Sequence, residues 1–235
     1  MEMYTFKSSI AGAALAAVVA LAATSASAFT FGDIPGGGVN EGLDDVYGTG
    51  TTTVDGYYGG QLVLFGDGAT VTVEYLGAEA GFTNSFIFEG DTLFTTTGDS
   101  SDFDLTGTGS RTIRNVSNGL LDFAFFIDRT AFNAGTSIVE NGSNPNGSTP
   151  DSDPNFFLTF QPSTGESAIE GTIVDLWLDD GGAGPDDNHD DMAIRLTVSG
   201  GTIGVVPVPA SVPLLLTALG GLGIAARRRK KASKA

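Results

Sequence analysis

An acidic loop near the C-terminal end of the chain has the side chains needed to bind a metal ion. Six carboxylates and three glycines lie between Asp179 and Asp191. Negative charges this close together repel one another unless a cation lies among them. Oxygen ligands on a flexible loop suit Ca²⁺, which accepts about six to eight oxygens in irregular geometry. We therefore expect calcium to bind here, with ligands drawn from Asp179, Asp180, Asp186, Asn188, Asp190 and Asp191.

The spacing within this loop only partly matches a known calcium loop. Asp186, Asn188 and Asp190 stand at i, i+2 and i+4, like the first three ligands of an EF-hand. The sixth position would then be Asp191 instead of glycine and the twelfth Thr197 instead of glutamate, so the loop is not an EF-hand. The alternative is that these side chains only hydrogen-bond the backbone of a tight turn.

The only histidine of the chain, His189, lies inside the same loop. Neighbouring carboxylates favour its protonated form. A Ser-His-Asp triad would have to use it, but no G-x-S-x-G motif precedes it and no histidine cluster exists for a catalytic zinc. We expect a solvated loop residue and assign no catalytic residue. A carboxylate pair for glycoside hydrolysis stays possible, because the sequence does not show how far apart the acids lie.

The loop is flanked by segments that read as β-strands, and the same pattern recurs along the chain. Residues 69–76 alternate Val and Tyr with Thr and Glu, a period of two with one buried face. Asn118-Gly119 predicts a hairpin turn between strands at 111–116 and 120–127. With no helical period in any eleven-residue window, we predict an all-β domain, an antiparallel, jelly-roll-like β-sandwich. The other expected strands are 61–65, 85–88, 92–95, 155–160, 168–178 and 192–198, after a loosely packed leading segment or edge ribbon at 29–60.

Composition excludes several classes of function for this domain, residues 29–205. It holds 27 of the 28 acidic residues and only four of the 11 Lys and Arg, a net charge near −23. Nucleic-acid binding needs clusters of Lys and Arg to neutralise phosphates, so we expect no nucleic-acid partner. The chain has no cysteine, which removes disulfides, thiolate catalysis and Cys-ligated zinc.

Both ends of the chain have the features of targeting signals. Lys7 precedes an apolar run at 10–23 and the sequence Ala26-Ser27-Ala28, as in a secretory signal peptide. We expect residues 1–28 to be removed by signal peptidase, between Ala28 and Phe29.

The C-terminal region, residues 206–235, combines a short motif, an apolar segment and a cluster of cations. The apolar segment, 211–226, is short: residues 213–226 as a helix span about 21 Å, against a bilayer core of about 30 Å. Clustered cations hold such a segment with its basic end in the cytoplasm. The motif is Val206, Pro207, Val208, Pro209 and Ala210, and the basic stop within 227–235 is Arg227, Arg228, Arg229, Lys230 and Lys231.

This tripartite end resembles the sorting signal of PEP-CTERM proteins, in its VPLPA-CTERM variant, with Val208 at the usual leucine position. The resemblance implies export through the inner membrane of a Gram-negative bacterium. It also implies a transient C-terminal inner-membrane anchor and processing by the membrane protease exosortase. An ordinary single-pass tail anchor is the alternative.

Two motifs in the domain add to this resemblance. The acidic loop is similar to the closing motif of many such proteins and of DUF4114-like domains, where it implies calcium binding. Residues 77–86, with Glu79 and Asn84, resemble a G-x-E-A-G-[FY]-x-N-x-F signature of VPLPA-tailed proteins. Strand pairing could bring Glu79, and Asn84 with it, to the acidic loop as further ligands.

The favoured hypothesis is a non-enzymatic, calcium-stabilised protein of the cell surface or extracellular matrix, associated with exopolysaccharide. A carbohydrate-binding module is the alternative, with Trp177 and Tyr57 as candidate sugar-contacting residues. We nonetheless expect Trp177 to point into the core, on the opposite face from Asp175 and Asp179. A polysaccharide hydrolase is the least favoured hypothesis.

Overall fold

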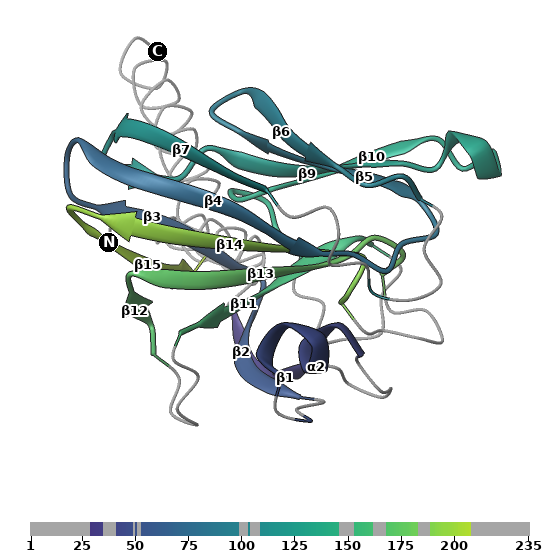
Figure 1. Cartoon of the computed structure of the whole chain (residues 1–235), viewed down its shortest axis with the longest axis horizontal. Coiled ribbons are helices and arrows are strands. Elements are labelled where there is room, and N and C mark those ends of the chain that lie inside the picture. The colour runs from purple at the N-terminus through teal and green to yellow at the C-terminus, as the bar shows by residue number, and fades with distance from the viewer. Residues whose placement is uncertain are drawn as a thin grey trace, which may run out of the picture. The chain divides into compact units, whose positions relative to one another are not determined.

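The folded part of the chain is an all-β, antiparallel structure with very little helix. The computed structural model describes residues 29–34, 41–48, 50, 53–98, 103, 109–145, 153–161, 168–182 and 189–207. Within these ranges lie fifteen strands, the helix α2 (Glu41–Tyr47) and the 3-10 helix η1 (Thr130–Phe132). The all-β prediction is therefore confirmed, and Figure 1 shows the strands.

The strands form three sheets in which all neighbours are antiparallel. The large sheet has the order β1-β2-β11-β13-β14-β4-β7, the β9 sheet β10-β9-β5-β6, and the β3 sheet β12-β15-β3-β8. In chain order the bounds are β1 Thr30–Ile34, β2 Val54–Tyr58, β3 Gly60–Phe65, β4 Ala69–Gly77, β5 Thr83–Phe88, β6 Asp91–Thr95, β7 Gly109–Val116, β8 Gly119–Leu120, β9 Phe123–Asp128, β10 Thr136–Glu140, β11 Asn155–Phe160, β12 Glu170–Gly171, β13 Ile173–Asp179, β14 Met192–Ser199 and β15 Thr202–Pro207.

One face of the large sheet shares a hydrophobic core with both smaller sheets, which makes the fold sandwich-like. Leu176 and Ile194 of the large sheet belong to the same fully buried cluster as Phe86 and Phe125 of the β9 sheet and Leu64 of the β3 sheet. Apolar residues occur at every second position of these strands, because alternate side chains of a β-strand point to the same face. Burial of this shared apolar surface is what holds the three sheets together.

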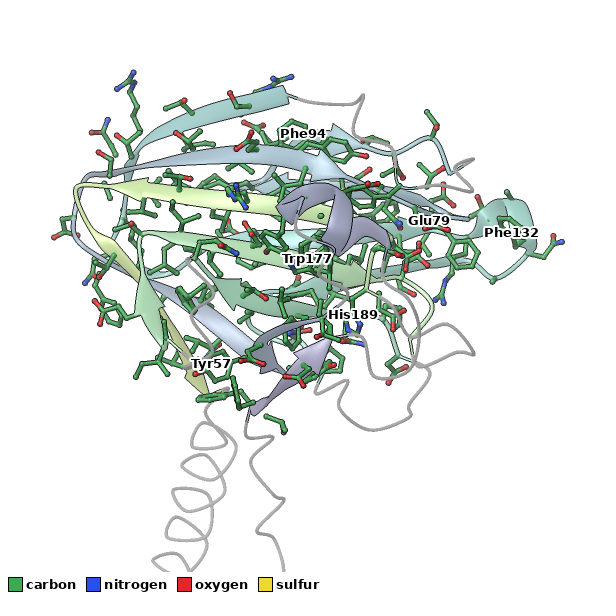
Figure 2. The ribbon with its side chains drawn as sticks, turned by 60° about the horizontal axis from the view of Figure 1, so that its bottom comes forward. Tyr57, Glu79, Phe94, Phe132, Trp177 and His189 are labelled. Carbon is green, nitrogen blue, oxygen red and sulfur yellow. The ribbon has the colours of Figure 1, made fainter. Side chains whose placement is uncertain are left out.

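The opposite face of the large sheet carries a second apolar cluster around helix α2. Trp177 is fully buried there and packs in one cluster with Leu43 of the helix. Figure 2 shows Trp177 beneath α2. Trp177 is thus in a core, as expected, but it shares its face with Asp175 and Asp179, because residues two apart on a strand point the same way. The expectation of opposite faces is wrong.

Several elements differ from the sequence-based prediction. Asn118-Gly119 does not close a simple hairpin, because β7 pairs with β4 while β8 pairs with β3 in another sheet. The expected strand at 120–127 is divided into β8 and β9 at the buried residue Leu121. The leading segment supplies the edge strand β1, one of the two alternatives predicted for it, and its described strands are well packed, since Ile34 and Tyr57 are buried. Helix α2, β10 and β15 were not predicted.

Asn141 stabilises the junction between two sheets, and its removal is expected to be costly. Its buried side chain accepts from the Leu62 N–H at 2.7 Å and donates to the Leu62 and Leu121 carbonyls, both at 2.8 Å. Asn141→Ala leaves the buried Leu62 N–H without its acceptor, while the Leu62 and Leu121 carbonyls each keep one other backbone donor. We therefore expect the free energy of unfolding to fall by about 1–3 kcal/mol in urea titrations. The matched control is Asn118→Ala, whose contacts are exposed. An equal loss in both variants would contradict this reading.

Candidate functional site

The acidic loop connects two strands that lie side by side in the large sheet. β13 ends at Asp179 and β14 begins at Met192, and Leu178 pairs directly with Met192. The ends of the loop therefore converge, and the carboxylates from both ends meet. Asp179, Asp180 and Asp190 are buried, with 4%, 4% and 1% of their surface exposed, and Asp191 is half-buried. Asp186 and Asn188, also predicted as ligands, lie outside the described residues.

Hydrogen bonds with the backbone fix the carboxylates at the two ends of the loop. The Asp180 N–H donates to the Asp191 carboxylate at 2.8 Å, and the Gly181 N–H donates to the Asp179 carboxylate at 3.0 Å. The Asp191 N–H donates to the Leu178 carbonyl at 3.2 Å. The turn-stabilising role considered for these side chains is thus real for Asp179 and Asp191, whose carboxylates each accept a backbone N–H of the loop.

Asn84, on β5 of the β9 sheet, reaches the same place from the opposite layer. Its Nδ2 donates to Asp180 Oδ2 at 2.6 Å and contacts the Asp191 carbonyl at 3.4 Å. The Asn84 side chain is fully buried, and its Oδ1 has no hydrogen-bond partner. A buried carbonyl oxygen without a donor is costly, and this one lies on a side chain already held against a carboxylate.

Glu79 also lies beside the loop, as the sequence suggested. It follows β4, and its backbone N–H donates to the Asp190 carbonyl at 2.8 Å. Figure 2 shows Glu79 at this end of the domain. The two segments of the signature motif, around Glu79 and Asn84, are therefore both brought to the acidic loop by the fold.

The electrostatics of the cluster show that its carboxylates repel one another. Burial, followed by the negative charge of Asp180 and those of Asp179 and Asp190, raises the pKa of the Asp191 carboxyl group well above its ordinary value. A bound divalent cation would reverse this effect, because it favours the ionised form of every carboxylate around it.

The donor set fits a hard cation, although the described residues do not complete a site. All the candidate groups present are carboxylate or amide oxygens, the ligands that Ca²⁺ prefers. In the part of the chain that the structure describes, no group of three or more His, Cys, Asp or Glu side chains is arranged to hold a metal ion. Asp186 and Asn188 lie outside this part of the chain.

His189 is not a solvated residue, which corrects the expectation from sequence. Its ring is fully buried against Tyr58 and Phe157, and its Nε2 lies 2.8 Å from Asn155 Oδ1. Since that oxygen is an acceptor, Nε2 is the protonated nitrogen of a neutral ring. Burial lowers the pKa of His189 to about 3, so desolvation outweighs the neighbouring carboxylates that were expected to keep it charged. A ring held in this way does not reach a substrate.

The burial and the neutral state of His189 can be tested directly, because the chain has no other histidine. We expect its imidazole signals in NMR spectra to stay those of the neutral Nε2–H form between pH 5 and pH 8. The folded pKa lies below the ordinary value of 6.5, so the stability that the neutral ring contributes is present above pH 6.5. That contribution is lost as the pH falls toward 3. A midpoint near 6.5 in the folded protein would contradict the buried placement.

A buried ion pair on the same face of the large sheet was not anticipated. Asp175 is fully buried, and its carboxylate accepts from Arg195 Nε at 2.7 Å and Nη2 at 2.8 Å. The Tyr47 hydroxyl donates to it at 2.6 Å, and Gln161 Nε2 donates at 3.0 Å. One feature of the sequence points to this ion pair: Arg195 is one of only four cations in the domain and stands in an otherwise apolar strand. This cluster fixes helix α2 to the sheet and offers no free group for chemistry.

The aromatic residues considered for sugar contact are not available at the surface. Trp177 is fully buried, and Tyr57 is 2% exposed. Tyr57 instead packs edge-on against Phe29, with 5.0 Å between the ring centroids. Neither residue can stack on a polysaccharide in this structure.

Most of the predicted targeting residues lie outside the described part of the chain. This applies to Ala26 and Ala28, to the motif residues Val208, Pro209 and Ala210, to the apolar segment, and to the basic stop. Val206 and Pro207 are described and belong to β15, where they pair with Gln61 and Gly60. The fold therefore continues two residues past the predicted boundary at 205. Among the described helices, none is long and apolar enough to span a bilayer.

The chain was also compared with known proteins. No protein-family model matches it, and a search of curated proteins found no match.

Proposed function

We propose that this chain is a non-enzymatic protein that is exported, stabilised by calcium and sorted to the cell surface or extracellular matrix. In this proposal a jelly-roll-like sandwich lies between a cleaved signal peptide and a short C-terminal anchor, which exosortase processes. The protein then associates with exopolysaccharide. The assignment of the two ends rests on their sequences and on the resemblance to VPLPA-tailed proteins.

The observation that carries the calcium part is the convergence of carboxylates and Asn84 at one end of the sandwich. Three buried aspartates and Asp191 come from the two ends of one loop, and the unpartnered Oδ1 of Asn84 comes from the other layer. A cation ligated there would join the large sheet to the β9 sheet. Asp179, Asp180, Asp190, Asp191 and Asn84 are the described candidates, Glu79 lies next to them, and Asp186 and Asn188 would complete the set.

The end of β15 supports a close connection between the folded domain and the sorting motif. The first two motif residues, Val206 and Pro207, are paired in the β3 sheet. Processing after the motif would thus take place within a few residues of the folded sheet. The remaining stub would be too short to act as a flexible linker, so the cleaved protein would be attached or released as a rigid unit.

Processing of the tail can be tested with full-length variants in a Gram-negative host that has an exosortase. With Pro207→Ala and Pro209→Ala combined, we expect an unprocessed form that stays in the membrane fraction, as measured by intact mass and fractionation. Ser211→Ala, just outside the motif, is the control and should be processed normally. Normal processing of the double variant, or recovery of the unaltered chain from the cytosol with residues 1–28 attached, would refute the proposal.

A further inference from the structure

The β3 sheet differs from the other two sheets in its lack of charge. Its four strands contain sixteen residues, and Glu170 is the only charged one among them. That carboxylate accepts a hydrogen bond from the Thr202 hydroxyl at 2.6 Å. The β9 sheet carries Glu140, Asp128 and Asp91, and the large sheet carries eight charged residues. In a domain with 27 acids, a nearly neutral sheet indicates a surface with a specific partner.

The outer face of this sheet is largely apolar, and its one carboxylate, the exposed Glu170, lies at the edge strand β12, where it pairs with Gly204. Val63 pairs directly with Leu120 on one side and Gly204 on the other, so these residues share a face. Phe65, two residues from Val63, lies on that face as well, and a Cβ on Gly204 would be 2.7 Å from its ring. Leu64 and Ile203, with the opposite orientation, are fully buried in the core. Phe65 is 45% exposed and Leu120 is 52% exposed, so the outer face presents large apolar side chains to its surroundings.

The chain leaves the domain from this same sheet. β15 is its second strand and ends at Pro207, and the part of the apolar segment that we expect to span the bilayer core as a helix, 213–226, begins at Pro213. Six residue steps of extended chain cover at most about 21 Å. The headgroup region of one leaflet is about 5–8 Å thick. When the tail is inserted in a bilayer, the β3 sheet is therefore held within a short distance of the lipid surface.

We propose that the outer face of the β3 sheet, with Phe65, Leu120 and Val63 at its centre, rests on the lipid surface while the tail is anchored. The anionic surfaces of the other sheets are repelled by anionic headgroups. This face instead buries apolar side chains that water would otherwise cover when it rests on the membrane surface, which is favourable. Lipid is favoured over a protein partner because the tether brings this face to the bilayer without any further binding step. The inference rests on the membrane anchoring in the proposed function.

The absence of cysteine allows a direct test with single-cysteine variants of the full-length chain. Leu120→Cys and Phe65→Cys report on the proposed face. Ile138→Cys is the matched control, since Ile138 lies on β10 of the β9 sheet and is 53% exposed. Leu215→Cys reports on insertion of the tail. Each variant is labelled with an environment-sensitive fluorophore and reconstituted in phosphatidylethanolamine–phosphatidylglycerol vesicles, with and without brominated lipid as a quencher.

We expect the labels at 65, 120 and 215 to shift their emission to the blue in vesicles and to be quenched by brominated lipid. The label at 138 should do neither. Quenching at 215 without quenching at 65 and 120 would overturn the inference and leave the anchoring intact. No quenching at 215 would refute the anchoring itself. A blue shift at 65 and 120 in buffer without vesicles would show that the tail or a second copy covers the face, and would also overturn the inference.

Discussion

Calcium is expected to raise the melting temperature of the full-length protein by roughly 5–10 °C, and chelation is expected to reverse the change. A ligand at 100 times its dissociation constant adds about 2.7 kcal/mol to the stability of the state that binds it. For a domain of this size each kcal/mol shifts the melting temperature by about 2–4 °C. The measurement is a thermal melt in calcium and in excess EGTA, with magnesium as a control for ionic strength. Magnesium should have a smaller effect, because it requires nearly octahedral geometry.

The variant Asp191→Asn separates a calcium site from a turn that is only hydrogen-bonded. The amide oxygen can still accept from the Asp180 N–H, so the turn is retained. Burial and then repulsion by Asp180 and the other carboxylates raise the pKa of this carboxyl group, so both disfavour its charged form. Without calcium, removal of this charge relieves both effects, so the variant should melt above the wild type. With calcium, the variant should gain much less than the wild type. The order of the two proteins is thus expected to reverse between EGTA and calcium.

An acid away from the cluster serves as the matched control for this reversal. Asp91 is exposed on β6, and Asp91→Asn makes the same chemical change as Asp191→Asn. Each variant loses one negative charge and replaces one carboxylate oxygen with an amide nitrogen. It should respond to calcium like the wild type. If the wild type shows no shift with calcium, or if Asp191→Asn and Asp91→Asn respond equally, the loop is not the calcium site.

The fold class was predictable because the alternation of apolar residues survives in most strands. Residues 69–76 and 192–198 were recognised by period two, and both are long strands of the large sheet. The pairing of strands was not predictable, because it depends on contacts far apart in sequence. Asn118-Gly119 shows this well: the chain bends at Asn118, but the predicted hairpin does not form, because β8 pairs with β3, some fifty-five residues earlier along the chain.

The candidate site could be predicted only in part, because some of its residues lie far apart in the sequence. The carboxylates of one loop are adjacent in sequence and are predicted from their composition, whereas Asn84, which reaches Asp180 across 96 residues, is predicted only through the resemblance of residues 77–86 to a family signature. His189 was misjudged because charge was visible in the sequence and burial was not. The rings of Tyr58 and Phe157, which exclude water from it, come from β2 and β11. Local composition therefore indicated the chemistry of the site, and only the fold determined its dielectric environment.

The largest loss of stability from a single substitution is expected at Asp175. Four donor groups converge on its carboxylate, and three of them, from Arg195, Tyr47 and Gln161, share Oδ2. In Asp175→Asn, one carboxylate oxygen is replaced by an NH₂ group that faces these donors, and Arg195 loses its counter-charge. Breaking a buried pair in this way costs about 3–5 kcal/mol. Urea titration should show that loss, with an equivalent fall in melting temperature.

Two further substitutions show whether the cluster acts as a unit that holds helix α2. Tyr47→Phe removes one hydrogen bond to a charged acceptor, and we expect a loss of about 1.5–3 kcal/mol. Arg114→Met on the exposed edge strand β7 is the control for loss of an arginine and should change the stability by less than about 0.5 kcal/mol. In a double-mutant cycle, Tyr47→Phe and Arg195→Met should be non-additive by at least about 0.5 kcal/mol, because both bind the same carboxylate. Additive effects would mean that the helix is held by the apolar contacts of Leu43 and Trp177 alone, and that the ion pair stabilises only strands β13 and β14.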